Sequence, residues 1–179
     1  LQLAGFSCRL LLARVLLGNP PQPAARQHCL VLVEMAGQHW IADAGFGAAY
    51  APPMRLIDGA ISTSGDGARH RLRFIDGSDA RPHAFAAGWV LEREGPSAAT
   101  DGRGEEGGWQ GQYAFDLAPV ALADCQLGNF WTSTHPSARF TNFTVVSRCL
   151  PDGFTGIVDT TLSHFRKGQN VQQKKLENF

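Results

Sequence analysis

Residues 27–47 contain two apolar runs joined by a short turn, and this stretch constrains the fold more than any other. The first run, residues 28–35, is rich in leucine and valine, and the second covers residues 39–46. Between them, Ala36 and Gly37 can supply the positive φ angles that a tight β-hairpin requires. The sequence therefore predicts two antiparallel strands folded back on each other.

The length of the turn decides which residues of the two strands face each other. With Ala36 and Gly37 as the whole loop, His28 lies opposite Gly45. Asp43 is then diagonal to His28 on the same face, with about 7–8 Å between the Cα atoms. A carboxylate can span that gap and accept a hydrogen bond from the imidazole. A register longer by one residue would put the two side chains on opposite faces, so the predicted contact depends on the turn.

A histidine oriented by an aspartate supplies two of the three groups of a nucleophilic triad. The carboxylate fixes the imidazole tautomer, and the other ring nitrogen then accepts a proton from a thiol or a hydroxyl group. Taken alone, such a pair is more often a surface hydrogen bond. The surroundings favour a site, because Ala-Gly-Phe-Gly follows Asp43 and allows close approach of a ligand to the backbone. Trp40 and Phe46 add apolar bulk beside it.

These motifs resemble the arylamine N-acetyltransferase family. The family has a histidine at the start of one strand and Asp-Val-Gly-Phe-Gly fifteen residues later; here His28 precedes Asp43-Ala44-Gly45-Phe46-Gly47 at the same spacing. Further matches are Gly5-Phe6, Ala13-Arg14-Val15, Asn129-Phe130-Trp131-Thr132-Ser133-Thr134-His135-Pro136 and Phe140. The resemblance covers most of residues 3–165. Ala44 replaces the usual valine, and Gln27 stands where a threonine is common.

The resemblance implies an α+β fold that is mainly β in this chain. A β-barrel domain is expected over residues 1–118, a helical linker over residues 119–137 and an incomplete lid subdomain over residues 138–179. The architecture would be cysteine-protease-like, as in transglutaminases.

The resemblance also implies an activity and site residues. In the family, an acetyl group passes from acetyl-CoA to a cysteine and then to the nitrogen of an arylamine or hydrazine, and no metal is needed. Here His28 would be the base that generates the thiolate, and Asp43 would orient it. Phe46 and Gly47 would line the acceptor and CoA cleft, and Phe140 would contact CoA.

The family's nucleophile lies in an Arg-Gly-Gly-x-Cys-type motif upstream of the Gly-Phe segment, and these 179 residues contain no such motif. The chain is therefore expected to be a fragment that is inactive as it stands, and its C-terminus also looks cut short. In the family a helical region packs against the barrel. Leu3, Phe6, Trp40 and Phe46 are the candidates for apolar side chains left without that partner.

The four cysteines, at positions 8, 29, 125 and 149, show no close pairing and no metal-ligand spacing. Reduced, structural thiols in a cytoplasmic protein are the simplest interpretation. Cys8 is expected to be buried filler in a strand. Cys29 follows His28 directly, so alternation along the strand points it to the opposite face and removes it as the nucleophile for that histidine.

The middle of the chain predicts further barrel strands at residues 69–75, 88–92 and 110–116. Periodicity permits either a helix or a strand over residues 9–17, and the resemblance favours a strand. Arg69, Arg71 and Arg73 alternate, which predicts a solvated face, with phosphate binding as the less favoured interpretation. His70 and His83 are predicted at the surface. Residues 95–112 predict a mobile loop, whose Gly102-x-Gly104 lacks the strand and helix of a phosphate-binding loop.

The C-terminal third predicts a helix over residues 119–130 that stops at Gly128-Asn129. Residues 140–150 and 155–165 predict a hairpin across Pro151-Asp152-Gly153. A polar, lysine-rich tail follows at residues 171–179.

Charge and hydropathy exclude some partners. The formal net charge is +0, so long-range charge favours neither nucleic acid nor an anionic membrane, and no apolar run is as long as a membrane span. Two other functions remain open. One is a transglutaminase- or papain-like thiol hydrolase, which would use the same three groups. The other is a non-catalytic chain that binds CoA, an arylamine or a partner protein.

Overall fold

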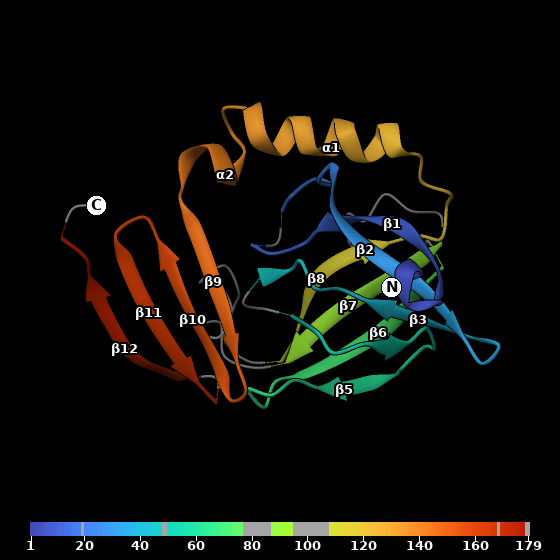
Figure 1. The fold of residues 1–179 in the computed structure, drawn as a ribbon, viewed down its shortest axis with the longest axis horizontal. Coiled ribbons are helices and arrows are strands. Elements are labelled where there is room, and N and C mark those ends of the chain that lie inside the picture. The colour runs from blue at the N-terminus through green and yellow to red at the C-terminus, as the bar shows by residue number, and fades with distance from the viewer. Residues whose placement is uncertain (19, 48–49, 77–86, 95–107, 168, 178–179) are drawn as a thin grey trace.

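The structure, a computed structural model, describes residues 1–18, 20–47, 50–76, 87–94, 108–167 and 169–177. In chain order it contains an antiparallel eight-stranded sheet, a long helix and a second, four-stranded sheet (Figure 1). A 3₁₀ turn at Gln2–Ala4 precedes the strands of the first sheet, which are β1 (Ser7–Val15), β2 (Arg26–Met35), β3 (Gln38–Ala42), β4 (Met54–Arg55), β5 (Ile61–Thr63), β6 (Arg69–Ile75), β7 (Gly88–Glu94) and β8 (Trp109–Phe115).

The first sheet curves into a nearly closed barrel. Its strand order is β4-β3-β2-β1-β8-β7-β6-β5, so the two edge strands are β4 and β5, which only residues 56–60 separate in the chain. The barrel interior is apolar, and Tyr113 and Phe115 of β8 are fully buried there. The remaining buried members of this core are Leu11, Ala13, Leu30, Leu32, Ile41, Ala51, Met54, Leu72 and Leu91.

The predicted barrel strands are confirmed. Residues 69–75 form β6, residues 88–92 lie within β7, and residues 110–115 lie within β8. The segment at residues 9–17, ambiguous by periodicity, contributes most of β1, as the family resemblance favours. His83, Gly102-x-Gly104 and most of the predicted loop at residues 95–112 lie outside the described residues.

Helix α1 (Leu122–Thr134) lies along β2 on the outside of the barrel (Figure 1). It begins where the Ala121 N–H donates to Asp124 Oδ2 at 2.8 Å. The predicted stop at Gly128-Asn129 is wrong. A Cβ at Gly128 would lie 3.3 Å from the Arg26 carbonyl oxygen, so this glycine serves close packing of the helix on β2 rather than termination. A short helix, α2 (Arg139–Asn142), follows.

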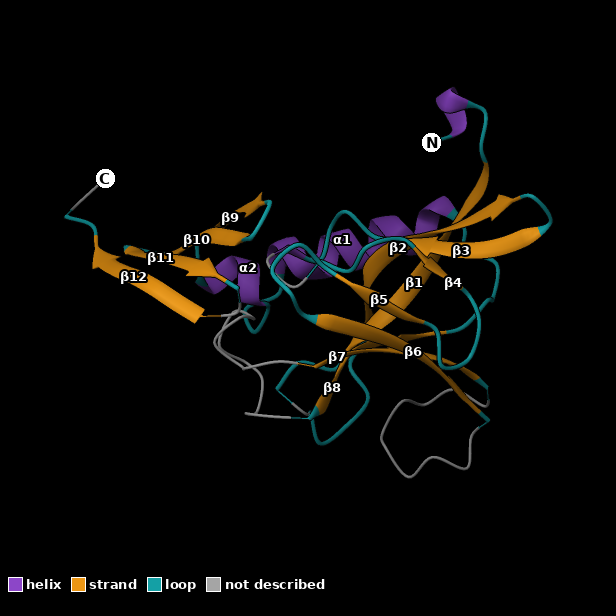
Figure 2. Ribbon diagram, turned by 90° about the horizontal axis from the view of Figure 1, so that it is seen from below, coloured by secondary structure: helices purple, strands orange, loops and turns teal. Residues whose placement is uncertain are grey.

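The second sheet has the order β12-β11-β10-β9 and lies beside the barrel (Figure 2). Its strands are β9 (Val145–Leu150), β10 (Gly153–Val158), β11 (Thr161–Arg166) and β12 (Gln169–Lys175). The predicted turn at Pro151-Asp152 is confirmed, because Leu150 pairs with Gly153. The predicted strand limits are wrong. Phe140 belongs to α2, and residues 155–165 divide into two strands at Asp159, whose φ of 51° reverses the chain. The polar segment predicted as a tail contributes β12.

The predicted fold class is thus confirmed as mainly β within an α+β chain. The division at residues 118 and 137 stays a prediction, although the last barrel strand ends at Phe115 and the second sheet begins at Val145. Among the described residues, no helix combines the length and the apolar character needed to cross a membrane.

The alternating arginines of β6 form an outward-facing ladder whose charges are matched by β7. Arg69 Nη1 lies 2.7 Å from Glu94 Oε2, and Arg71 Nε lies 2.9 Å from Glu92 Oε2. The guanidinium of Arg71 also stacks 4.4 Å from the centroid of Trp109. These arginines therefore act within the sheet, which argues against the phosphate-binding interpretation.

The prediction that His70 lies at the surface is wrong. Because Arg69 and Arg71 point outwards, alternation turns His70 into the barrel, where it is fully buried. There Ser64 Oγ donates to Asp66 Oδ1, so the His70 Nε2–H donates to Ser64 Oγ at 3.0 Å. Arg93 Nη2 lies 2.7 Å from Asp66 Oδ2 and completes a buried polar cluster. Burial opposes ionisation of Asp66, but the Ser64 hydrogen bond and the Arg93 charge outweigh it and lower its pKa.

The barrel and the second sheet meet at two glycines of the barrel chain. A Cβ added at Gly65 would overlap the Pro151 carbonyl oxygen, and one at Gly47 would lie 3.6 Å from Ser147 Oγ. The loop that contains Ser64 and Asp66 of the buried cluster therefore contacts the β9–β10 turn directly.

The hairpin turn provides a test of backbone strain. Ala36 and Gly37 have φ values of 51° and 69°, as a two-residue turn with two left-handed positions requires. Alanine is strained in this conformation, whereas asparagine tolerates it. We expect Ala36→Asn to raise the free energy of unfolding by about 1 kcal/mol in urea denaturation. Gly37→Ala, the matched control, should lower it. Equal stability of the two variants would contradict this account of the turn.

The buried histidine makes stability depend on pH. Burial, and then the nearby Arg93 charge, lower the pKa of His70 from 6.5 to about 4. Between these values the unfolded chain binds a proton that the folded chain does not, so stability falls as the pH falls. We expect a loss of about 2 kcal/mol from His70 between pH 7 and pH 5. His70→Gln keeps an N–H donor and should remove this component, whereas exposed His39→Gln should not. Parallel urea denaturation curves at both pH values measure the difference.

Candidate active site

His28 sits on β2 beside a β-bulge. In the pairing of β1 with β2, Ala13 faces His28 and Arg14 faces Arg26, so Gln27 is an extra residue without a partner opposite. Bulges bend a strand and re-aim the neighbouring side chains. The imidazole next to this bulge points towards the end of β3 and is 11% exposed.

Asp43 directly follows β3 and meets His28 as the hairpin register predicts. Met35 pairs with Gln38, which confirms Ala36 and Gly37 as the complete loop. His28 Nε2 lies 2.5 Å from Asp43 Oδ2, and the Asp43 side chain is 2% exposed. Because a carboxylate only accepts hydrogen bonds, Nε2 carries the proton and Nδ1 is left as the basic nitrogen of a neutral ring.

The second carboxylate oxygen of Asp43 also accepts a hydrogen bond. The Gly45 N–H donates to Asp43 Oδ1 at 2.9 Å, so both oxygens of Asp43 have fixed partners. A Cβ on Gly45 would lie 3.9 Å from His28 Cε1, which shows how closely this backbone passes the imidazole. The carboxylate therefore fixes both the tautomer and the direction of the ring.

Two aromatic rings enclose the imidazole. The ring centroid of His28 lies 4.8 Å from that of Phe46 and 5.0 Å from that of Tyr113. Phe46 also packs against the barrel core, so the expectation that it lacks a partner is wrong. Trp40 is half-buried, whereas Leu3 and Phe6 are exposed as expected. Large exposed apolar side chains also lie on α1 and α2, which the sequence did not predict as unpartnered: Leu122, Leu127, Phe130 and Phe140.

Tyr113 is a site residue that sequence reasoning missed. It is fully buried on β8 beside His28, and burial followed by the Asp43 charge raises its pKa well above 10.0. Its phenol therefore stays protonated and neutral next to the carboxylate. The sequence places Tyr113 in a barrel strand, but pairing it with His28 requires the β1–β8 and β1–β2 registers together.

The structure brings together only part of the predicted site. His28, Asp43 and Phe46 are in contact, and Gly47 follows them with a φ of 65°, close to β9. Phe140 lies on α2 with 66% of its surface exposed. Within the described residues, no ring contact or hydrogen bond joins Phe140 to His28 or Asp43.

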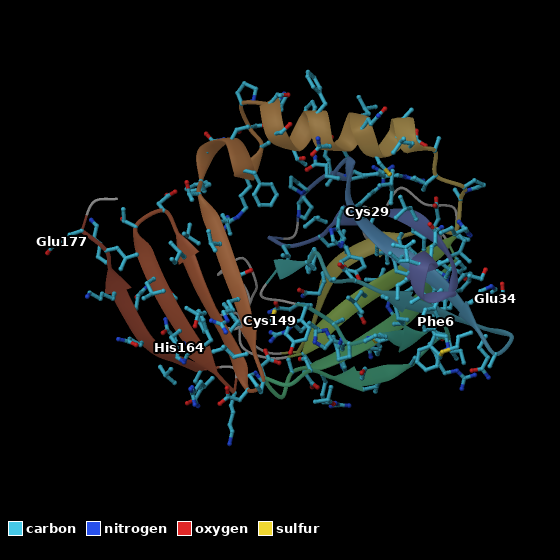
Figure 3. The ribbon with its side chains drawn as sticks, viewed as in Figure 1. Phe6, Cys29, Glu34, Cys149, His164 and Glu177 are labelled. Carbon is cyan, nitrogen blue, oxygen red and sulfur yellow. The ribbon has the colours of Figure 1, made fainter. Side chains whose placement is uncertain are left out.

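All four cysteines are described, and none is hydrogen-bonded to His28. Cys8 is in a strand, as predicted, but is half-buried rather than buried. Cys29 lies on the side of β2 towards α1, and Cys149 lies on β9 with Sγ 3.9 Å from the Gly47 carbonyl oxygen (Figure 3). The fourth, Cys125, is on α1. The arrangement thus provides an oriented base, His28, but none of the four cysteine thiols is hydrogen-bonded to its Nδ1 atom.

The part of the chain that the structure describes contains no candidate metal-binding site. No group of three or more histidine, cysteine, aspartate or glutamate side chains gathers there in an arrangement that could hold an ion.

Comparison with known proteins gives a consistent result. A family model described as N-acetyltransferase matches residues 1–178. The chain is 33% identical over 174 residues to the arylamine N-acetyltransferase of Escherichia coli K12, an alignment that covers 96% of this chain and 54% of the relative. The chain therefore spans about half the length of the curated relatives it matches.

Solved structures show the same fold. The arylamine N-acetyltransferase of Salmonella typhimurium superimposes with a TM-score of 0.81 at 27% identity, over 99% of this chain and 58% of that one. The Mycobacterium marinum enzyme in complex with CoA gives a TM-score of 0.79 at 24% identity, over 99% and 59%. These likenesses confirm the predicted cysteine-protease-like architecture.

Proposed function

Because the chain belongs to the arylamine N-acetyltransferase family, we propose that its His28–Asp43 pair serves acetyl transfer from acetyl-CoA to the nitrogen of an arylamine or hydrazine. His28 is the general base in this proposal, and Asp43 orients it. The observation that carries the proposal is the 2.5 Å contact between His28 Nε2 and Asp43 Oδ2, which leaves Nδ1 to receive a proton.

The geometry suits a two-step transfer through a cysteine. Nδ1 takes the proton of a thiol, and the resulting thiolate attacks the acetyl carbonyl of acetyl-CoA. The CoA thiolate leaves and takes up the proton from the imidazolium. The amine then attacks the acetyl-cysteine and gives a proton back through His28, so the cysteine thiol is restored. A carboxylate held by both His28 and Gly45 stabilises the transient imidazolium without moving.

The aromatic enclosure assists this chemistry. Phe46 and Tyr113 pack against the imidazole ring, so the His28–Asp43 hydrogen bond is shielded from water and is electrostatically stronger than an exposed one. Tyr113 stays neutral and adds no charge that would compete for the proton. In this proposal Phe46 lines the acceptor pocket.

The CoA part of the proposal rests on Gly47, Phe140 and family membership. In this proposal Gly47 lines the CoA cleft; it lies between the barrel and β9, where an added Cβ would be 3.6 Å from Ser147 Oγ. Phe140 offers an exposed ring on which an adenine or a pantetheine chain can pack. The structurally similar M. marinum enzyme was solved with CoA.

We further propose that these 179 residues alone do not transfer acetyl groups, since none of their four cysteines is hydrogen-bonded to His28. A chain that binds CoA or a partner without catalysis is the second candidate, and the same absence of a positioned thiol favours it. The family match favours acyl transfer over the thiol-hydrolase alternative.

The catalytic proposal is tested by supplying the thiol. We expect no arylamine acetylation by the chain alone, and activity in a chimera that joins the preceding part of the E. coli relative to residue 1. In that chimera, Asp43→Asn should reduce kcat by roughly 10³–10⁴-fold, because the tautomer is no longer fixed. His28→Gln should abolish activity. His39→Gln should leave it unchanged, because the His39 side chain is exposed on β3. Product formation followed by chromatography measures each rate.

Some outcomes would contradict the assignment. Acetylation of Cys8 or Cys29 by acetyl-CoA in the chain alone, at a rate abolished by His28→Ala, would show that a thiol of this chain is the nucleophile. If the Asp43→Asn chimera has the same kcat as the unsubstituted chimera, Asp43 has no part in the mechanism.

The CoA contact is tested by calorimetric titration with CoA. We expect Phe140→Ala to weaken binding about 3–10-fold through loss of a stacking contact. Phe143→Ala is the matched control, because Phe143 is an exposed neighbour whose ring is occupied by Arg139 at 5.5 Å. If the Phe140→Ala and Phe143→Ala variants bind CoA with equal affinity, Phe140 is not part of the CoA site.

A further inference from the structure

Two cysteine side chains meet where α1 packs on the barrel, on a face that the proposed acyl transfer does not use. Cys29 is exposed on β2, and Cys125 is half-buried in the first turn of α1. Figure 3 shows Cys29 beneath the helix. Burial, and then the nearby Cys125 thiol, raise the pKa of Cys29, which agrees with this proximity.

The backbone geometry supports this juxtaposition independently. Cα atoms of α1 and β2 approach within 8 Å of each other. Gly128, one turn after Cys125 on the same helix face, lies so close to β2 that an added Cβ would be 3.3 Å from the Arg26 carbonyl oxygen. A disulfide requires Cα atoms within about 7 Å, and the close packing of α1 on β2 favours such an approach between Cys125 and Cys29.

We propose that Cys29 and Cys125 form a dithiol modification site that peroxides oxidise to a disulfide between β2 and α1. In the first step a thiolate attacks one oxygen of hydrogen peroxide. The O–O bond breaks, the sulfur becomes a sulfenic acid and hydroxide leaves as water with the thiol proton. In the second step the other sulfur displaces the sulfenic hydroxyl group, which leaves as water with the second thiol proton. Two sulfur atoms give up two electrons, and one peroxide becomes two waters.

The raised pKa of Cys29 favours its thiol form at neutral pH, which makes Cys29 a weak first nucleophile. Oxidation joins α1 covalently to the strand that carries His28, one residue before Cys29, and closes a long loop through most of the barrel.

The test uses the full 179-residue chain with Cys8→Ser and Cys149→Ser, which leaves only the proposed dithiol. After treatment with hydrogen peroxide, alkylation and digestion, mass spectrometry should find the Cys29 peptide linked to the Cys125 peptide within one chain. The Tm should rise by roughly 5–15 °C and return to its starting value with dithiothreitol. The matched control carries Cys29→Ser and Cys149→Ser and should show neither the link nor the rise.

A second measurement does not depend on oxidation. Phenylarsine oxide bridges two neighbouring thiols, so the chain with only Cys29 and Cys125 should bind one equivalent, and the control should bind none tightly. Separate alkylation or sulfinic acid formation at the two cysteines without a link would overturn the proposal. So would a link that forms only between two chains, or equal arsenical binding by the control.

Discussion

The two-residue turn at Ala36-Gly37 is the constraint on which the candidate site depends. Both residues take positive φ, which makes the shortest loop that joins β2 to β3 and pairs Met35 with Gln38. Because side chains alternate along a strand, this pairing alone brings His28 and Asp43 to one face. A single additional loop residue would separate them, whatever the rest of the barrel did. A strained alanine at the tip of a hairpin therefore determines the geometry of an acid–base pair at its other end.

Short-range features were predictable from the sequence, because a few neighbouring residues decide them. The β2–β3 register, the His28–Asp43 contact and the Pro151 turn all follow from local pattern, and the structure has each of them. The family resemblance added what periodicity left open, namely that residues 9–17 form a strand.

Three of the misses have their physical origin in tertiary contacts, whereas the wrong strand limits near Phe140 and Asp159 arise from a local helix and a local turn. Gly128 reads locally as a helix stop, but its lack of a side chain lets α1 pack against the Arg26 carbonyl group. His70 reads as a polar surface residue, but Ser64, Asp66 and Arg93 supply hydrogen bonds and charge inside the barrel. Tyr113 reaches the imidazole only through two successive strand registers. For Gly128 and Tyr113 the partner lies tens of residues away, and local sequence carries no signal for it.

The contact between Gly65 and Pro151 has a consequence for how this architecture can vary. Main-chain atoms form this contact, whereas the contacts of Gly47 with β9 involve the side chains of Ser147 and Cys149. Within the second sheet Phe154 is buried and stacks on Phe165, whereas the edge strand β12 is exposed along its whole length. Substitutions on β12 therefore alter the exposed surface without touching the Gly65–Pro151 contact. At Gly65, by contrast, a single methyl group would overlap the Pro151 carbonyl oxygen and would have to displace the β9–β10 turn.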